Sequence, residues 1–133
     1  MLAAPLVASR RMQPRDVARL HAIGRIAVGA ALTAAPERSG SAWVGELGRR
    51  PGAGVLTTGL GARDLAIGAG IASALRRGYG ANPWMRAGVL ADTADLVATV
   101  RARRHLPPLA VACVALIAAG SAALGLWAQS AVD

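Results

Sequence analysis

An arginine and an aspartate, Arg63 and Asp64, stand side by side inside the apolar, glycine-rich stretch LGARDLAIGAG at residues 60–70. Three more ionisable residues, Arg25, Asp92 and Asp95, also lie in the middle of apolar stretches. In hydrocarbon each unpaired central charge costs roughly 2.5–3.5 kcal/mol, so such residues need partners or internal water. Two roles are open to them: an ion-pair lock between helices, or a polar cavity for a ligand or a proton.

The composition favours closely packed helices in a membrane. The 133 residues are 54% hydrophobic and 17% charged, with a mean hydropathy of +0.42, which is too apolar for an ordinary soluble domain of this size. All 15 basic residues are arginines, and they gather at the ends of apolar stretches. That distribution is typical of contact with lipid headgroups. Nucleic-acid binding is not expected, because no basic stripe with interleaved aromatic residues is present.

Four apolar segments predict the helices that must position the charges. The last segment is the clearest, because it is uncharged and long enough to span a bilayer. Short connections predict antiparallel neighbours, and SAWVGELG predicts a short helix in the membrane interface. We therefore expect a single all-α transmembrane domain over residues 1–133, an integral membrane four-helix up-down bundle with both termini on one side. Its parts are a short N-terminal arm at 1–15 and helices at about 16–36, 54–75, 82–101 and 107–129.

The five charged residues are expected to meet at one depth. At about 1.5 Å per residue, Arg63 and Asp64 lie about 15 Å into the second helix, near the centre of a core of about 30 Å. Arg25, Asp92 and Asp95 fall near the middle of their own helices. We expect the second helix to lie between the first and third, with Asp64 paired to Arg25. Arg63 should pair with Asp92 or Asp95, and those two acids should share one proton.

The other polar and aromatic residues are expected near the membrane surfaces. Trp43, Trp84 and Trp127 are predicted at headgroup depth, because an indole suits a mixed boundary. His21 and His105 are the only histidines, and the four spans would place them near opposite faces. A haem held by two histidines is therefore not expected.

The motifs GLGARDLAIGAG and RAGVLADTADLV resemble a group of small bacterial four-helix membrane proteins that have no settled function. The group shares a G-x-R-D-x-x-x-G second helix and an aspartate-containing third helix, and it is distantly similar to the DoxX-like membrane proteins. The resemblance covers roughly residues 17–128. It implies a multi-pass protein of the bacterial inner membrane. Because some DoxX-like proteins work beside quinone-linked oxidoreductases, it also implies a lipid or quinone-like ligand.

The leading hypothesis is a non-enzymatic integral membrane protein. It would be an accessory or scaffold subunit, or a binder of a small apolar ligand at the Arg/Asp network. Its partners would be the lipid bilayer and either a second copy or a larger membrane complex. Catalytic residues, cofactors and metals are not expected, since the chain has no phosphate loop and its one cysteine, Cys113, excludes a CxxC site.

Two other functions stay open. The first is a small proton-coupled transporter or channel, since seven arginines on one side against six on the other resemble dual-topology exporters. These numbers also leave the orientation undecided. The second is an enzyme acting on lipid or quinone, with Asp92 or Asp95 as its acid or base.

Overall fold

The computed structural model describes residues 12–129, and within them every regular element is helical, as the sequence predicts. Two short 3-10 helices accompany five α-helices. In chain order the elements are α1 (Pro14–Ala34), α2 (Pro36–Val44), η1 (Gly45–Arg49), α3 (Pro51–Arg77), α4 (Asn82–Ala102), η2 (Arg103–His105) and α5 (Pro108–Gln129).

Proline and glycine set most of the helix boundaries. Each α-helix has a proline in its first turn, where the missing backbone N–H costs nothing. The residue before a proline avoids helical geometry. Ala35, before Pro36, accordingly adopts φ −137° and ψ 63°, and it separates α1 from α2. Gly78 ends α3 in the left-handed conformation, with a φ of 71°.

The predicted segments differ from the observed helices only at their ends. The first helix stops at Ala34 instead of residue 36, because Pro36 begins the next helix. The second is longer than predicted and covers Pro51–Arg77. The short helix predicted around SAWVGELG is present as α2 and η1. Most of the predicted N-terminal arm, residues 1–11, lies outside the described residues.

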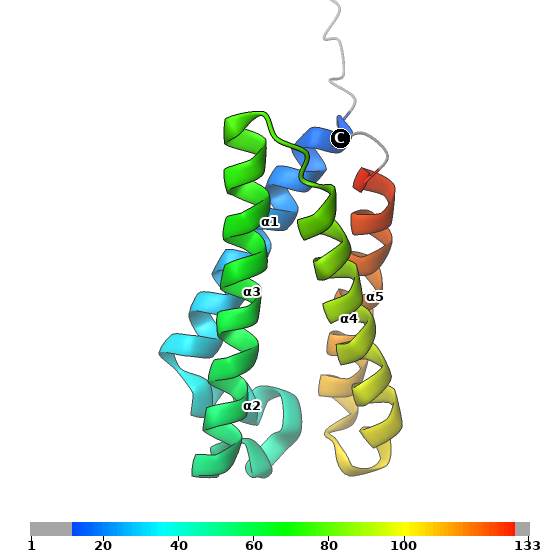
Figure 1. Ribbon diagram of the computed structural model, residues 1–133. Helices are drawn as coiled ribbons and strands as arrows, with labels where there is room; N and C mark the ends of the chain where they lie inside the picture. Colours follow the sequence, from blue (N-terminus) through cyan, green and yellow to red (C-terminus); the bar gives the residue numbers. More distant parts are fainter. Residues whose placement is uncertain (1–11, 130–133) are drawn as a thin grey trace, which may run out of the picture.

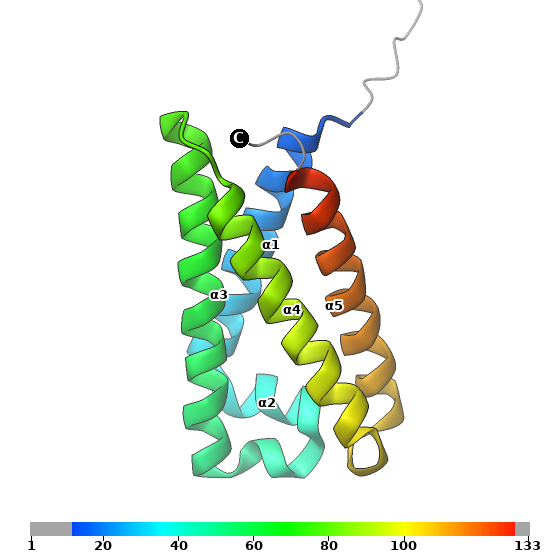
Figure 2. The ribbon, with the colours of Figure 1, turned by 45° about the vertical axis from the view of Figure 1, so that its right-hand side comes forward.

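The four long helices α1, α3, α4 and α5 alternate in direction (Figures 1 and 2). The start of α1 and the end of α5 therefore lie at the same end of the molecule. The most extensive contacts join α1 to α3 and α4 to α5, while α3–α4 and α1–α5 contacts are sparser. As expected, α3 touches both α1 and α4.

The buried apolar core is small and lies at one end of the helices. It combines the start of α1, the end of α3 and the start of α4, for example Ala18, Ile71 and Met85, which are fully enclosed. Towards the middle of the helices the buried residues are charged instead: Arg25, Asp64 and Asp92. The polar cluster therefore replaces the apolar core at mid-height.

Two of the described helices, α1 and α5, are long and apolar enough to cross a membrane. Their most apolar windows have mean hydropathies of 1.2 and 2.3, and only 28% and 17% of those windows is buried. The sequence predicts four spans, and α3 and α4 do not meet the same criterion. The reason is their composition, since α3 is rich in glycine and α4 carries four charged residues.

Candidate functional site

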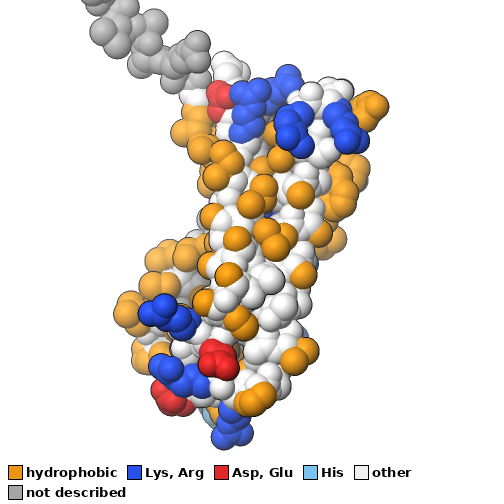
Figure 3. Space-filling model, turned by 90° about the vertical axis from the view of Figure 1, so that its left-hand side faces the viewer, with side chains coloured by type: hydrophobic (Ala, Val, Ile, Leu, Met, Phe, Trp, Pro, Cys, Tyr) orange, Lys and Arg blue, Asp and Glu red, His pale blue; other side chains and the backbone are white. Residues whose placement is uncertain are grey.

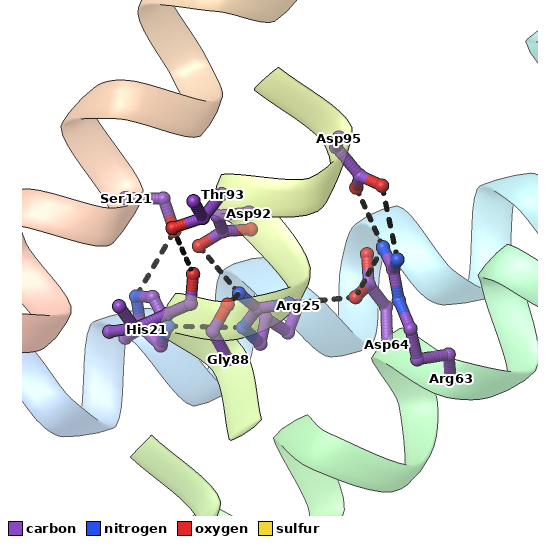
Figure 4. A network of polar contacts seen from close by, with 10 residues as sticks. His21, Arg25, Arg63, Asp64, Gly88, Asp92, Thr93, Asp95 and Ser121 are labelled. Carbon is purple, nitrogen blue, oxygen red and sulfur yellow. Dashed lines mark hydrogen bonds and ion pairs between the residues drawn. The ribbon is translucent and has the colours of Figure 1, made fainter. Parts of the chain in front are cut away.

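Arg25 of α1 is the centre of a buried network that connects three helices (Figure 4). Its Nη1 donates a hydrogen bond to Asp64 Oδ1 of α3 at 2.7 Å, and its Nη2 donates to the Gly88 carbonyl of α4 at 2.8 Å. The Nη2 atom also lies 2.6 Å from Asp92 Oδ2. With 5% of its surface exposed, Arg25 is held almost entirely by other side chains and backbone.

Gly88 allows Arg25 to approach α4 this closely. A Cβ atom at position 88 would lie 3.0–3.2 Å from three atoms of the Arg25 guanidinium, closer than side chains normally pack. The missing side chain exposes the helix carbonyl, which has a second lone pair for an extra donor. The glycine thus forms part of the arginine site.

A second ion pair extends the network towards the other end of α4. Arg63 donates two hydrogen bonds to Asp95, from Nη1 to Oδ1 at 3.1 Å and from Nη2 to Oδ2 at 2.7 Å. Paired bonds of this kind are the strongest geometry for arginine and carboxylate. The Nη2 atom is also 3.4 Å from Asp64 Oδ1. The five side chains therefore form one continuous series of ion pairs in which negative and positive charges alternate. Their order in space is Asp92, Arg25, Asp64, Arg63, Asp95.

The structure brings together all five residues that the sequence singled out. It confirms the expected pairing of Asp64 with Arg25. Arg63 was expected to pair with Asp92 or Asp95, and it pairs with Asp95. The expectation for Asp92 and Asp95 was wrong in its geometry. These two acids do not form a pair of their own, because each faces a different arginine.

His21 belongs to the network, whereas the sequence placed it near a membrane face. Arg25 Nε donates to His21 Nε2 at 3.0 Å, so the imidazole is neutral and carries its proton on Nδ1. That nitrogen lies 3.4 Å from Ser121 Oγ of α5, and it can donate to this oxygen. The missed signal was the spacing of four between His21 and Arg25, which puts both on one helix face.

The tryptophans divide into one inner and two outer residues. Nε1 of Trp43 in α2 donates inward to Thr99 Oγ1 of α4 at 3.2 Å, and the headgroup depth of this residue stays a prediction. Trp84 and Trp127 keep 42% and 48% of their surface exposed. Trp84 packs its ring over Gly70 of α3.

A cavity of about 320 Å³ lies beside the network. The charged residues and His21 form one wall, and apolar side chains from α1 and α5 form another. The lining consists of His21, Gly24, Arg25, Val28, Leu32, Trp43, Arg63, Asp64, Asp92, Asp95, Val114, Ile117, Ala118 and Ser121. The polar wall and the apolar wall together suit a molecule with a polar group and a hydrocarbon body.

Two polar atoms of this lining have no hydrogen-bond partner among the described residues, Arg63 Nε and Asp92 Oδ2. Asp92 Oδ2 nevertheless has an ionic partner, since it lies 2.6 Å from Arg25 Nη2, the nitrogen that also donates to the Gly88 carbonyl. Buried polar atoms normally find partners. Arg63 Nε is therefore the atom of this lining that has neither a hydrogen bond nor an ion-pair contact among the described residues.

The chemistry that these residues can perform is binding and proton exchange. With every group ionised, two arginines face three aspartates, which leaves one negative charge in excess. Among residues 12–129 no group of three or more histidine, cysteine, aspartate or glutamate side chains could hold a metal ion. No family model matches the sequence, and no curated protein or solved structure matches the chain.

Proposed function

We propose that this chain is an integral membrane protein with four spanning helices that binds a small, largely apolar molecule beside its Arg/Asp network. The molecule would place a polar group, such as a carbonyl or hydroxyl, against the charged wall that Arg63, Asp92 and Asp95 form. Its hydrocarbon part would lie along α1 and α5. A lipid or a quinone-like compound has this chemistry. The observation that carries the proposal is the cavity, with its charged wall on one side and its apolar wall on the other.

The exposed apolar surface supports a membrane environment. The α5 helix has the highest hydropathy of the chain, and yet its large side chains face outward, for example Leu109, Leu116 and Ile117. The core helix of a soluble protein would be mostly buried. Figure 3 shows charged side chains gathered at the two ends of one face, and between them a band in which hydrophobic side chains lie among uncharged side chains and backbone. Such a band fits the hydrocarbon layer.

The spacing of the charges on α3 supports a span there as well. Arg50 and Arg76 stand near its two ends, 26 residues apart, which is about 39 Å of helix. A bilayer with its headgroup regions is about 40–45 Å thick. The only charged residues between them are Arg63 and Asp64, and both have partners. Pairing lowers the cost of charges at the membrane centre, so α3 and α4 can cross despite their polar residues.

A binding or scaffold role fits the lining better than catalysis does. The one histidine at the cavity has both ring nitrogens engaged, by Arg25 and Ser121. The aspartates are held in ion pairs instead of facing a nucleophile. The proposal also includes a distant relationship to the DoxX-like membrane proteins and a location in a bacterial inner membrane. It includes assembly with a second copy of the chain or with a larger membrane complex as well.

A pair of glycine substitutions tests the binding proposal. Gly24 lines the cavity, and a Cβ there meets nothing within 4 Å, so Gly24→Leu fills the cavity without a backbone clash. Gly59 of α3 also has open space and lies outside the cavity, and Gly59→Leu is the matched control. Both changes favour the helix equally.

The probe is a long-chain alcohol with a photoreactive diazirine, added to proteoliposomes of each variant. Mass spectrometry of the crosslinked peptides should show labels on Leu32, Trp43 and Val114 in the unmodified protein and in Gly59→Leu. Gly24→Leu should lose most of these labels and keep those on the outward-facing Leu116. Equal labelling of the cavity residues in both variants would rule out a bound molecule there.

A proton-coupled transporter or channel is the second candidate, and the excess negative charge favours it. Asp92 lines the cavity, and a proton or a cation on it would balance the charges of the network. The α1–α3 pair and the α4–α5 pair make few contacts with each other, so the two pairs could move relative to one another. Proton uptake into proteoliposomes, followed with a pH-sensitive dye and lost in Asp92→Asn, would support transport over simple binding.

A further inference from the structure

A second hollow lies on the outer surface between α1 and α3, away from the charged network. It has a volume of about 430 Å³. Its floor and sides are apolar, and Arg19 and Arg76 stand at one end of it. The lining residues are Arg19, Ala22, Ile23, Ile26, Ala69, Ala72, Leu75 and Arg76.

The groove follows from close helix packing beside small residues. A Cβ at Gly68 would lie 2.8 Å from Ile26 Cγ1 and 2.9 Å from the Ala22 carbonyl, so α1 and α3 are nearly in backbone contact. Next to this contact, Ala69 and Ala72 leave a channel beside the larger side chain of Ile23. Arg19 and Ile26 are seven residues apart, which makes the channel about 10 Å long.

The charged end of the groove attracts anions. Arg76 forms no ion pair with a described residue, and Arg19 has only a loose contact of 3.6 Å with the exposed Asp16. Two carbonyl groups at the end of α3 already accept hydrogen bonds, since Arg15 Nη2 donates to the Leu75 carbonyl and Tyr79 N donates to the Ala74 carbonyl. Figure 3 shows arginine side chains gathered at this end of the face, above hydrophobic and uncharged side chains.

We infer that this groove binds one anionic phospholipid. The phosphate contacts Arg19 and Arg76, and an acyl chain lies along Ile23, Ile26 and Ala69. The inference rests on the proposed membrane location and is independent of the cavity. An arginine pair above an apolar channel matches a charged headgroup above its acyl chain. Each arginine near an anionic headgroup strengthens binding several-fold, so phosphatidylglycerol should be preferred over phosphatidylcholine roughly 10- to 30-fold.

The test uses the full chain purified in a maltoside detergent, with phosphatidylglycerol or phosphatidylcholine of identical acyl chains added. Lipid occupancy is measured by native mass spectrometry, and Tm by thermal unfolding. The double variant Arg19→Ala/Arg76→Ala should lose most of the preference. Arg101→Ala/Arg104→Ala, two exposed arginines at the opposite end, is the matched control and should keep it. Ala69→Trp fills the channel and should lower occupancy while both arginines remain.

Three results would overturn the inference. Equal occupancy by the two lipids would show that charge plays no part. Retention of the preference in Arg19→Ala/Arg76→Ala would place the lipid elsewhere. An equal rise of Tm with inorganic phosphate alone would show an anion site without a chain. A chain that stays dispersed without detergent would contradict the membrane location itself, which separates that failure from failure of the lipid site.

Discussion

Asp64 holds the network together because both arginines reach the same carboxylate. Its Oδ1 accepts from Arg25 at 2.7 Å and from Arg63 at 3.4 Å. Each guanidinium partner offsets part of the hydration that the buried carboxylate loses. Two adjacent residues on α3 can serve both α1 and α4 because side chains one position apart point about 100° apart.

Arg25 is predicted to matter more for stability than Arg63. Arg25→Ala removes the arginine partner of Asp92 and the main partner of Asp64, and it should lower the free energy of unfolding by about 3–5 kcal/mol. The Arg63 side chain is 29% exposed and makes its main contacts with one aspartate, so Arg63→Ala should cost about 1–2 kcal/mol. Unfolding in mixed micelles measures both losses.

Arg86→Ala is the control for these variants. Arg86 is exposed on α4 and forms no ion pair with a described residue, so its loss should change the free energy of unfolding by less than about 0.5 kcal/mol. If Arg63→Ala proved as damaging as Arg25→Ala, the network would be centred on Arg63, and the burial of Arg25 would not govern its contribution.

The sequence predicts the members of the network better than it predicts their partners. The position of a residue along its helix follows from counting residues, and this count correctly predicted that all five charged residues lie close together. The partners depend on helix rotation and separation, which no residue count contains. Asp92 and Asp95 share one face of α4. The rotation of α4 about its axis decides which arginine each of them contacts, and in the structure these are Arg25 and Arg63 respectively. His21 was missed because depth alone placed it nearer the surface.

At the scale of elements, α1 and α3 cross at glycines. A Cβ at Gly29 would lie 2.7 Å from the Gly61 carbonyl, and a Cβ at Gly61 would lie 2.8 Å from the Gly29 carbonyl. No side chain larger than hydrogen fits at either position without moving the helices apart. The same close approach lets Arg25 reach Asp64, so the crossing positions the network as well as the helices.

Gly61→Ala is predicted to destabilise the α1–α3 pair. The added methyl group must push against backbone atoms of α1, which should cost about 1–3 kcal/mol. Gly59→Ala on the same helix meets open space and should be neutral or stabilise by up to about 1 kcal/mol. Thermal unfolding of the two variants in one detergent compares them directly. Equal Tm values would mean that the helices can separate at no cost and that the crossing is not tightly packed.

Helix positions were predictable because prolines begin the helices and apolar stretches define their lengths. The inner location of Trp43 was not predictable in the same way. A tryptophan in a short amphipathic helix fits an interface equally well whether its N–H faces water or Thr99. Only the fold of α2 beneath the long helices decides this, and that fold depends on the connection through η1.

At the scale of the whole molecule, arginines occupy both ends. Arg15, Arg19 and Arg76 mark the end where α1 starts and α3 ends, while Arg50 and Arg101 mark the other. In the proposed membrane protein, arginines would contact headgroups in either orientation, so this symmetry does not decide the orientation. The exposed apolar side chains between the two ends fit the proposed membrane location, and the alternating helices set which connections share an end of the molecule.

Single-cysteine labelling is predicted to show three of the four proposed crossings, those of α1, α3 and α4. In a Cys113→Ala background, Met12→Cys and Tyr79→Cys should react with a membrane-impermeant maleimide from one side of sealed vesicles. Leu47→Cys and Arg104→Cys should react only from the other side, because α1, α3 and α4 each cross between these positions. All four residues are exposed, and a permeant maleimide should label every variant equally as the control. Labelling of Leu47→Cys and Tyr79→Cys from the same side would mean that α3 does not cross. Its Arg63–Asp64 pair would then hold a helix that lies against the membrane surface.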